Sequence, residues 1–326
     1  MTSPPTIRTV AEHAGVSVAT VSQVLSGRAG ATIRVGEQTR ERVLASVEKL
    51  GYVPNQAARG MRRGRTDQVC LVLHQLDTPW SRAMTQAVAD AVSPHGYSTV
   101  ILADGDWERY LMRQGADAAF IDAVGPGDAD RLRTLAARGV SIVAYGNGIR
   151  PEGFDVVRTE GRAACEEAVA MLASRHARIA LLRNGGSASL RTVAFRHTMR
   201  KHGLTVDRDL VRVTHSSRDI AYREAISLLQ MADRPTAIFA TSDLAAMSAL
   251  AAAHRLGVRV PDDLEIIGVG NSPEGEAADP PLTSVGADAI FTDIAQMLLE
   301  RLQSRSPITG RTLTSTWTVH RRGTTR

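Results

Sequence analysis

The residues that most often carry catalytic or metal chemistry form no recognisable constellation in this sequence. The 326 residues include nine histidines and two cysteines, but no His-Glu-x-x-His pair, no Gly-x-Ser-x-Gly elbow and no Walker loop. Gly268-x-Gly270 and the run 184–187 stop short of a complete phosphate-binding pattern, and we interpret both as tight turns. The sequence therefore predicts a protein that is not an enzyme and that needs neither a metal nor a cofactor.

The two cysteines and the N-terminus indicate a compartment. Cys70 and Cys165 lie far apart in apolar surroundings, where unpaired cysteines usually behave as small hydrophobic residues. Residues 1–9 lack the apolar core of a secretory signal. We also find no apolar stretch of about 18 residues, the length that a membrane span requires. A cytoplasmic protein without a membrane partner is the expected result.

Two apolar stripes at helical spacing predict two short helices near the N-terminus. Gly15 is placed to end the first helix in a left-handed conformation, and Ser17 is placed to cap the second. This pattern is typical of a helix-turn-helix. An ordinary helical hairpin in a core is the alternative, but it would leave the small, uncharged surface of the second helix without a purpose. The stripes consist of Val10, Ala11 and Ala14, and of Val21, Val24 and Leu25.

The positive charge of the chain lies at the same end. The net charge is +5, and residues 1–65 contain ten Lys and Arg against four Asp and Glu, so this segment carries +6 and the remainder −1. A basic segment attracts a polyanion, because each cation that neutralises a phosphate releases condensed counterions. Nucleic acid is a better partner than a membrane surface, since no basic amphipathic helix with bulky apolar anchors is present.

A third predicted helix, 37–50, leads into a segment with a specific spacing. Its matching positions are Tyr52, Pro54, Asn55, Ala58 and Met61. Together with the helix-turn-helix, this segment resembles the LacI/GalR family of transcriptional repressors. The resemblance implies a DNA-binding head over residues 1–50 and a hinge helix and linker over 51–66. It also implies that Met61 takes the place of the leucine that wedges into the minor groove of the operator.

The second helix of the head is expected to lie in the major groove. Val18, Ala19 and Gln23 would face base edges, and Gln23 can pair in a bidentate way with adenine. Short hydroxyl side chains suit phosphate oxygens, although they also suit helix caps. The residues that we expect to contact DNA are Thr6, Ser17, Val18, Ala19, Thr20, Ser22, Gln23, Ser26, Asn55, Arg59, Met61 and Arg62.

From residue 67 onward, short apolar runs alternate with helical patterns, which predicts βαβ units and parallel sheets. The resemblance implies an α/β body of two doubly wound subdomains, similar to periplasmic binding proteins, that joins the small all-α helix-turn-helix head. The first subdomain is expected at about 67–149 and 286–310, and the second at about 150–285 and 311–326. The whole body, 67–326, would bind an effector and dimerise.

Doubly wound subdomains bind ligands at the carboxyl ends of their strands. The residues that we expect to contact an effector are Trp80, Tyr145, Arg191, Asp243 and Asn271. Three positions depart from the family pattern: Gly270-Asn271 replaces a pair that usually contains aspartate, Tyr145 stands near another common acidic position, and Thr159-Glu160 replaces a usual Asp-Asn. Two potential carboxylate acceptors are therefore missing. Each lost charge-assisted hydrogen bond removes about 1.5 to 3 kcal/mol. We therefore expect an atypical effector with fewer hydroxyl groups than a simple hexose.

These features predict a repressor whose affinity for its operator is modulated by a small-molecule effector. A two-fold homodimer on a near-palindromic operator would double the few base contacts of one head. An effector-independent regulator, activator or DNA-bending protein is the alternative within regulation. A solute-binding protein is a weaker alternative, since the DNA-binding head argues against it.

Overall fold

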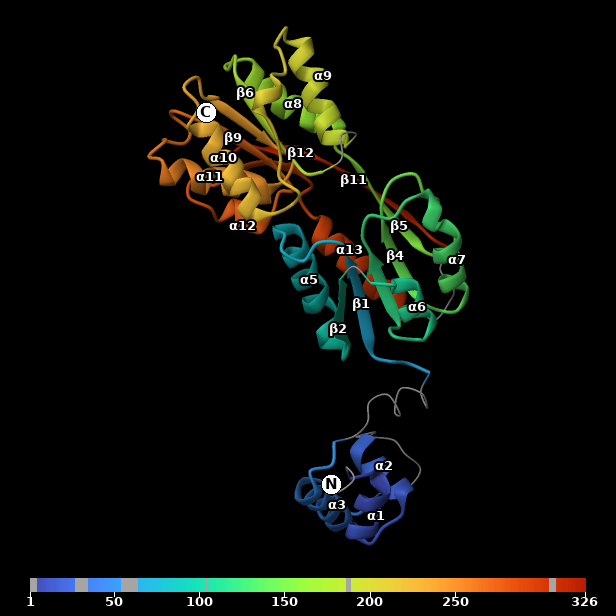
Figure 1. Ribbon diagram of the computed structural model, residues 1–326. Coiled ribbons are helices and arrows are strands. Elements are labelled where there is room, and N and C mark those ends of the chain that lie inside the picture. Colours follow the sequence, from blue (N-terminus) through green and yellow to red (C-terminus); the bar gives the residue numbers. More distant parts are fainter. Residues whose placement is uncertain (1–4, 27–34, 54–63, 104, 186–188, 305–308) are drawn as a thin grey trace. The chain divides into compact units, whose positions relative to one another are not determined.

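The computed structural model describes residues 5–26, 35–53, 64–103, 105–185, 189–304 and 309–326 (Figure 1). The chain divides into two compact units, 1–66 and 67–326. We call them the head and the body, and we describe each by itself.

The head contains the helices α1 (Ile7–Ala14), α2 (Val18–Ser26) and α3 (Glu37–Leu50). Gly15 ends α1 with a φ of 64°, and the backbone N–H of Thr20 donates to Ser17 Oγ at 3.1 Å. The predicted turn and cap are therefore confirmed. The core of the head is made by the expected stripes together with α3, and its buried apolar residues are Val10, Ala11, Ala14, Val21 and Val43.

The first sheet of the body runs in the order β11, β5, β4, β3, β1, β2, with every pair parallel. Its strands are β1 (Gln68–Leu73), β2 (Ser98–Ala103), β3 (Ala118–Ile121), β4 (Ser141–Tyr145), β5 (Asp155–Glu160) and β11 (Thr312–Thr316).

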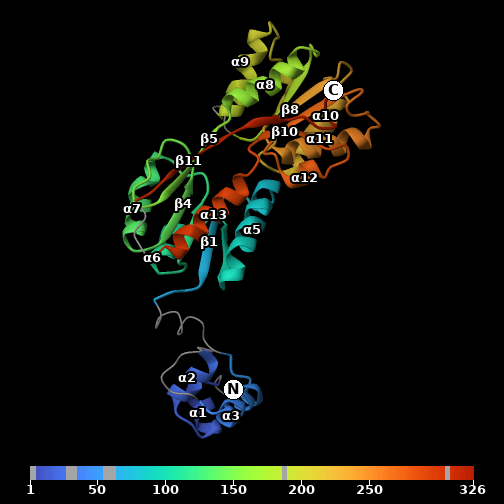
Figure 2. The same ribbon diagram turned by 180° about the vertical axis from the view of Figure 1, so that it is seen from behind.

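Helices cover both faces of this sheet, because successive side chains of a strand point to opposite faces. Leu71 packs in the same apolar cluster as residues of α5 (Pro79–Val92) and α13 (Ile290–Gln303). Cys70 and Val72 pack instead with α6 (Trp107–Met112) and α7 (Ala129–Ala137). Figure 2 shows the sheet between these helices. Two short 3-10 helices lie at Ser93–His95, after α5, and at Pro126–Asp128, before α7.

The second sheet runs in the order β12, β10, β9, β8, β6, β7, and only β12 is antiparallel to its neighbour among the pairs that the structure describes. Helices α8 and α9 cover one face, while α10 and α11 cover the other. The strands are β6 (Ile179–Arg183), β7 (Val211–Val213), β8 (Ala237–Ala240), β9 (Glu265–Val269), β10 (Thr283–Gly286) and β12 (Thr318–His320). The helices are α8 (Arg162–Ala173), α9 (Leu190–Lys201), α10 (Arg218–Leu229), α11 (Asp243–Arg255) and α12 (Pro273–Glu276), with a 3-10 helix at Arg208–Leu210.

The expected boundary between the subdomains at residue 150 is too early, as is the expected return at residue 311. Both β5 and β11 belong to the first sheet, so the chain crosses after Glu160, after Gly286 and after Thr316. The reason is an ionic anchor at the start of β5. Asp155 is fully buried and accepts from Arg301 Nη1 at 2.8 Å and from Arg311 Nη2 at 2.9 Å. These bonds hold β5 against α13 and β11.

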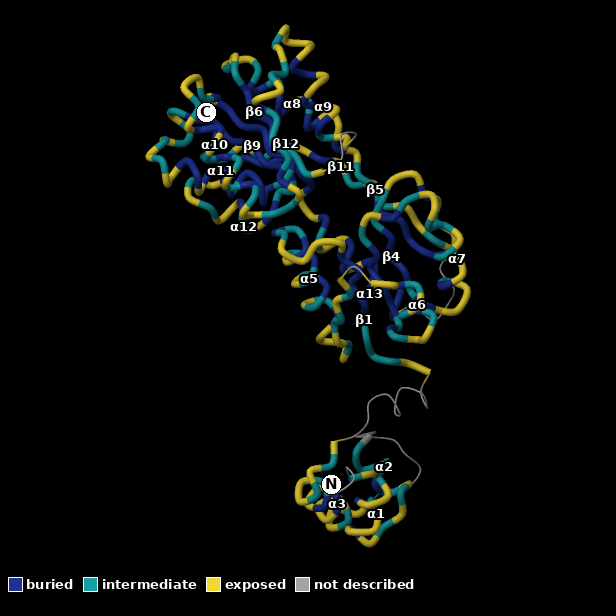
Figure 3. Tube along the Cα trace, in the orientation of Figure 1, coloured by how far each residue is buried: buried dark blue, intermediate teal, exposed yellow. Residues whose placement is uncertain are grey.

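The burial pattern agrees with two covered parallel sheets. Figure 3 shows the central strands as buried, while exposed residues lie on the outer sides of helices and in loops. Cys70 and Cys165 are buried and unbonded to each other, as expected for small hydrophobic residues. None of the described helices combines the length and the apolar character that crossing a membrane requires.

Candidate DNA-binding and effector sites

The surface of α2 carries the residues that we expect to read DNA. Ala19 is exposed, and Ser22 and Gln23 are partly exposed. Val18 is only partly available, because it also packs against the core of the head. The helix contains no charged residue, so hydrogen bonding by amide or hydroxyl groups and apolar contact are the means of recognition that it offers.

The N-terminal ends of α1 and α2 share a feature that suits phosphate. Thr6 caps α1 by accepting from Thr9 N at 3.3 Å, and Ser17 caps α2 while its hydroxyl lies 2.9 Å from that of Thr20. Neither helix has an acidic residue in its first turn. The positive ends of both helix dipoles therefore have no negative side chain of their own helix beside them, an arrangement that favours anions. Capping, the alternative role for these hydroxyls, is present, and it does not prevent a phosphate contact.

The remaining expected DNA contacts fall outside the described side chains. Asn55, Arg59, Met61 and Arg62 lie in the segment 54–63, which the structure does not describe. Ser26 is the last residue of α2, and its side chain is not described either. The hinge and the minor-groove wedge consequently stay predictions.

A cavity of about 380 Å³ lies in the body. Its walls follow the carboxyl ends of parallel strands in both sheets, as doubly wound folds predict. From the first subdomain it is lined by His74, Gln75, Thr78, Pro79, Trp80, Ser81, Asp122, Ala123 and Tyr145. From the second it is lined by Asn184, Arg191, Ser242, Asp243, Leu244, Val269, Gly270 and Ser272. Four of the five expected effector residues are therefore in one cavity.

An aromatic cluster forms part of the wall on the side of the first subdomain. The ring centroid of Trp80 lies 5.5 Å from that of Tyr145 and 6.0 Å from those of Phe120 and Phe291. Thr78 orients this part of the wall, because it caps α5 by accepting from Ser81 N at 3.1 Å. Rings fixed in this way present rigid apolar faces on which a flat or cyclic ligand can stack.

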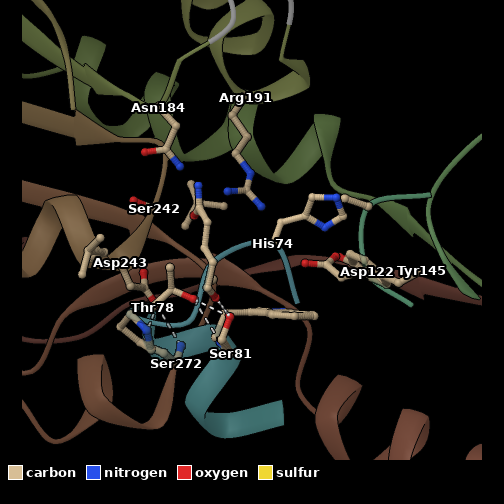
Figure 4. Close-up of a pocket in the computed structure, with 17 residues that line it drawn as sticks. His74, Thr78, Ser81, Asp122, Tyr145, Asn184, Arg191, Ser242, Asp243 and Ser272 are labelled. Atoms are coloured by element: carbon tan, nitrogen blue, oxygen red, sulfur yellow. Dashed lines mark hydrogen bonds between the residues drawn. The ribbon is translucent and has the colours of Figure 1, made fainter. Parts of the chain in front are cut away.

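Arg191 extends into the cavity from the side of the second subdomain, together with Asn184 (Figure 4). Its Nη1 donates to the carbonyl of Thr241 at 2.6 Å, and its guanidinium carbon lies 5.0 Å from the centroid of the Trp317 ring. These contacts hold the side chain in place. The guanidinium has five N–H donors, so donors are left for a ligand.

Asp243 lines the cavity, but its carboxylate is used by the protein. Oδ2 accepts from both the backbone N–H and the hydroxyl of Ser272 at 2.8 Å, and Oδ1 accepts from Ser284 Oγ at 2.6 Å. Asp243 is only 3% exposed. A Cβ on Gly268 would lie 2.4 Å from Asp243 Oδ1, so the glycine there makes room for the carboxylate. The role of Asp243 is to build the wall.

Asn271 is not among the residues that line the cavity, although Gly270 and Ser272 on either side of it are. Its side chain donates from Nδ2 to the carbonyl of Ala287 at 3.1 Å and accepts at Oδ1 from Arg322 at 2.7 Å. The expectation that Asn271 contacts the effector therefore has no support from the geometry. The left-handed backbone at this residue, with a φ of 46°, turns its side chain into these protein contacts.

Asp122 is the most informative lining residue that sequence reasoning missed. It follows β3 directly and is half-buried. Burial raises the pKa of its carboxyl from 3.8 to about 6, although His74, the N–H of Ala123 and Arg191 oppose the shift. Among the described residues no side chain donates a hydrogen bond to it. Asp122 therefore places a carboxylate in the cavity at a position other than the three that depart from the family pattern.

Three other lining residues that the sequence analysis did not predict also lie at the carboxyl ends of strands. His74 comes directly after β1, Asn184 directly after β6, and Ser242 lies between β8 and α11. Their positions at the ends of apolar runs could have identified them, because those runs predict the strands of the body. The pattern at 184–187 on its own predicts only a turn for Asn184.

The fold and the two sites define a DNA-binding regulator that carries a periplasmic-binding-protein-like domain. Residues 6–55 match the family described as bacterial regulatory proteins, lacI family, and residues 168–325 match the periplasmic binding protein-like domain. The HTH-type transcriptional regulator CelR from Thermobifida fusca is 31% identical over 91% of this chain and 92% of its own length. This chain belongs to the LacI family of transcriptional regulators.

Solved structures agree with this assignment. A structure titled as a complex of the transcriptional regulator CelR with cellobiose has a TM-score of 0.61 and 26% identity, and the match covers 98% of this chain and 99% of that one. A crystal structure of the lac repressor dimer bound to operator and an anti-inducer has a TM-score of 0.69 and 21% identity, with 99% of each chain covered. At 21% identity, the similarity to the lac repressor structure shows a shared fold.

Proposed function

We propose that this protein is a sequence-specific repressor whose affinity for operator DNA is set by a small molecule in the cavity of the body. One observation carries the proposal: the cavity takes its polar side chains from both subdomains, with Asp122 on one side and Arg191 on the other. A ligand that bonds to both fixes the distance between the subdomains. The first subdomain begins directly after the linker to the head, so this change can reach the DNA-binding unit.

The DNA target is a near-palindromic operator bound by a homodimer, in the cytoplasm. One α2 helix offers few base contacts, and a two-fold dimer doubles them. The edge strand β2 is consistent with a second copy, since it is only partly covered and Ile101 is 43% exposed. Arginines 59 and 62 of the hinge would add phosphate contacts, and Met61 would enter the minor groove.

The effector class that the cavity fits best is a carbohydrate. A hydroxyl group can donate to Asp122 and accept from Arg191 or from the amide of Asn184, while the Trp80 face stacks on a ring. Asp122 supplies a carboxylate acceptor, so the argument for a hydroxyl-poor ligand loses much of its basis. CelR, one of the relatives, has been solved with cellobiose, which makes cellobiose the first probe.

The test is selection of bound duplexes from a random DNA pool by the full-length protein, without ligand and with cellobiose, glucose or ribose. We expect an enriched near-palindrome and a change in its affinity when one sugar is added. Enrichment with unchanged affinity would favour an effector-independent regulator or activator, and sugar binding without enrichment would favour a solute-binding protein.

The variant Gln23→Ala sharpens the DNA part of the test. We expect it to relax the preference at one base pair in each half-site, by about 1 to 3 kcal/mol of discrimination. The matched control is Gln38→Ala, because Gln38 is exposed in the first turn of α3 and outside the reading helix. Equal changes in the two variants would argue against base reading by Gln23.

A further inference from the structure

An ion pair joins the two subdomains beside the cavity. Arg82 lies in the first turn of α5, and Glu274 lies in α12. Arg82 Nη2 donates to Glu274 Oε2 at 2.6 Å, and its Nε donates to Oε1. This fork geometry is the strong form of an arginine–carboxylate contact. Asp77 supports the arginine from the same subdomain, with 3.3 Å between Nη1 and Oδ1.

The pair lies next to residues that line the cavity. Ser81 precedes Arg82, and Ser272 lies two residues before Glu274; both serines are in the cavity wall. Ser272 is itself fixed by Asp243, and α5 and α12 are in contact. Moving one wall of the cavity relative to the other therefore changes the distance between Arg82 and Glu274.

The pair is unusual among the ion pairs of the body. Of the ion pairs between residues that the structure describes, the others lie within one subdomain, apart from His320–Asp288. That pair is located where the chain crosses between the sheets, close to the ends of β10 and β12. Arg82–Glu274 instead connects two helices that are far from each other in the sequence. Its side chains are 43% and 36% exposed, so it can break without burying an unpaired charge.

We propose that Arg82 and Glu274 are positioning residues that hold the two subdomains closed and thereby set the affinity for the effector without contacting it. This inference rests on the proposed function for its consequence, but the closure itself can be measured without ligand. An exposed ion pair favours the closed arrangement by a factor of about two to five. High salt weakens the preference, since exposed charges are screened.

The experiment measures the distance between spin labels in the ligand-free, full-length protein. Cysteines at Arg109 in α6 and Ser227 in α10, both exposed, carry one label in each subdomain. The native thiols interfere little, because burial raises the pKa of Cys70 to about 12 and that of Cys165 to about 11. Arg82→Glu and Glu274→Arg should each shift the distance distribution toward longer values.

Two further variants separate closure from general damage. The swap Arg82→Glu with Glu274→Arg should restore more than half of the shift, although Asp77 and Arg218 now face like charges. Arg133→Glu breaks an exposed pair network of Asp130 and Glu152 within the first subdomain and should leave the distribution unchanged. Single variants that match the unsubstituted protein, or a swap that behaves like the single variants, would overturn the proposal.

The consequence for binding is measured with cellobiose by calorimetry. Each single variant should bind it about two to five times more weakly, and the swap should recover most of that loss. If the distances respond but cellobiose does not bind, the proposed effector class fails while the role of the pair in closure stands. If the distances do not respond, the positioning role fails, and the selection of operator DNA is unaffected.

Discussion

Two aspartates in one cavity have opposite environments. Asp243, on the side of the second subdomain, accepts three hydrogen bonds from two serines and is 3% exposed. Asp122, on the side of the first subdomain, accepts from a backbone N–H, and burial raises the pKa of its carboxyl to about 6. The first carboxylate is saturated by the protein, and the second is left for something else.

The comparison distinguishes a carboxylate that holds the cavity wall together from one that is available to a ligand. Asp122 is only half-buried, but its carboxyl is partly desolvated and no side chain of the described residues donates to it, which calls for an explanation. A ligand that donates a hydrogen bond to Asp122 is such an explanation. Asp243 needs none, because Ser272 and Ser284 already satisfy it. The two residues should therefore respond to substitution in different ways.

The largest effect is expected for Asp243→Ala. The variant removes the acceptor of three buried donors and leaves a cavity, so we expect a loss of about 4 kcal/mol in the free energy of unfolding. Urea unfolding followed by circular dichroism measures it. Asp130→Ala is the control, since the Asp130 side chain is 87% exposed. A loss of less than about 1 kcal/mol, within the range of surface substitutions, would mean that Asp243 is not structural.

Asp122→Asn should have a smaller effect of the opposite sign that depends on pH. In the folded protein the Asp122 carboxyl keeps its proton up to a higher pH than in the unfolded chain, because burial raises its pKa from 3.8 to about 6. The stability of the unsubstituted protein should thus fall as pH increases from 4 to 6 and then stay lower. The amide of the variant cannot ionise, so the variant should gain up to about 3 kcal/mol relative to the unsubstituted protein at pH 7.5.

Unfolding at pH 4, 5, 6 and 7.5 checks this prediction. The difference between the variant and the unsubstituted protein should be small at pH 4 and largest at pH 7.5. If the stability of the two proteins changed with pH in the same way, folding would not raise the pKa of the Asp122 carboxyl. The same variant should bind cellobiose more weakly at pH 7.5, because an amide is a poorer acceptor than a carboxylate.

The sequence predicted the elements better than the partners of side chains. Runs such as 118–121 and 179–182 have the continuous apolar character of strands covered on both faces, and the structure confirms them. The strand Asp155–Glu160 lacks this signal, because only Val156 and Val157 in it are apolar and it begins with a charge. That charge is neutralised by Arg301 and Arg311, which are distant in the sequence.

The same limit applies to the site. Trp80, Tyr145, Arg191 and Asp243 are in the cavity, but hydrogen bonds decide what each does there. Nothing local to Asp243 reveals that Ser284 bonds to it, and nothing local to Asn271 reveals its bond to Arg322. Asp122 could have been found from its place after a predicted strand. Its raised pKa could not, because burial depends on the whole fold.

The smallest of the three effects is expected for Gly268→Ala, which tests how closely the protein is built around Asp243. A Cβ at this position would lie 2.4 Å from Asp243 Oδ1, 3.0 Å from Leu282 and 3.1 Å from Ala246. The strand or the carboxylate must shift, which costs about 2 kcal/mol. Gly125→Ala is the matched control, because its backbone is extended and nothing lies within 4 Å of the added Cβ. The two variants are compared by urea unfolding at pH 7.5. If they are equally stable, Asp243 has room to move and is available to a ligand after all, and the contrast with Asp122 fails.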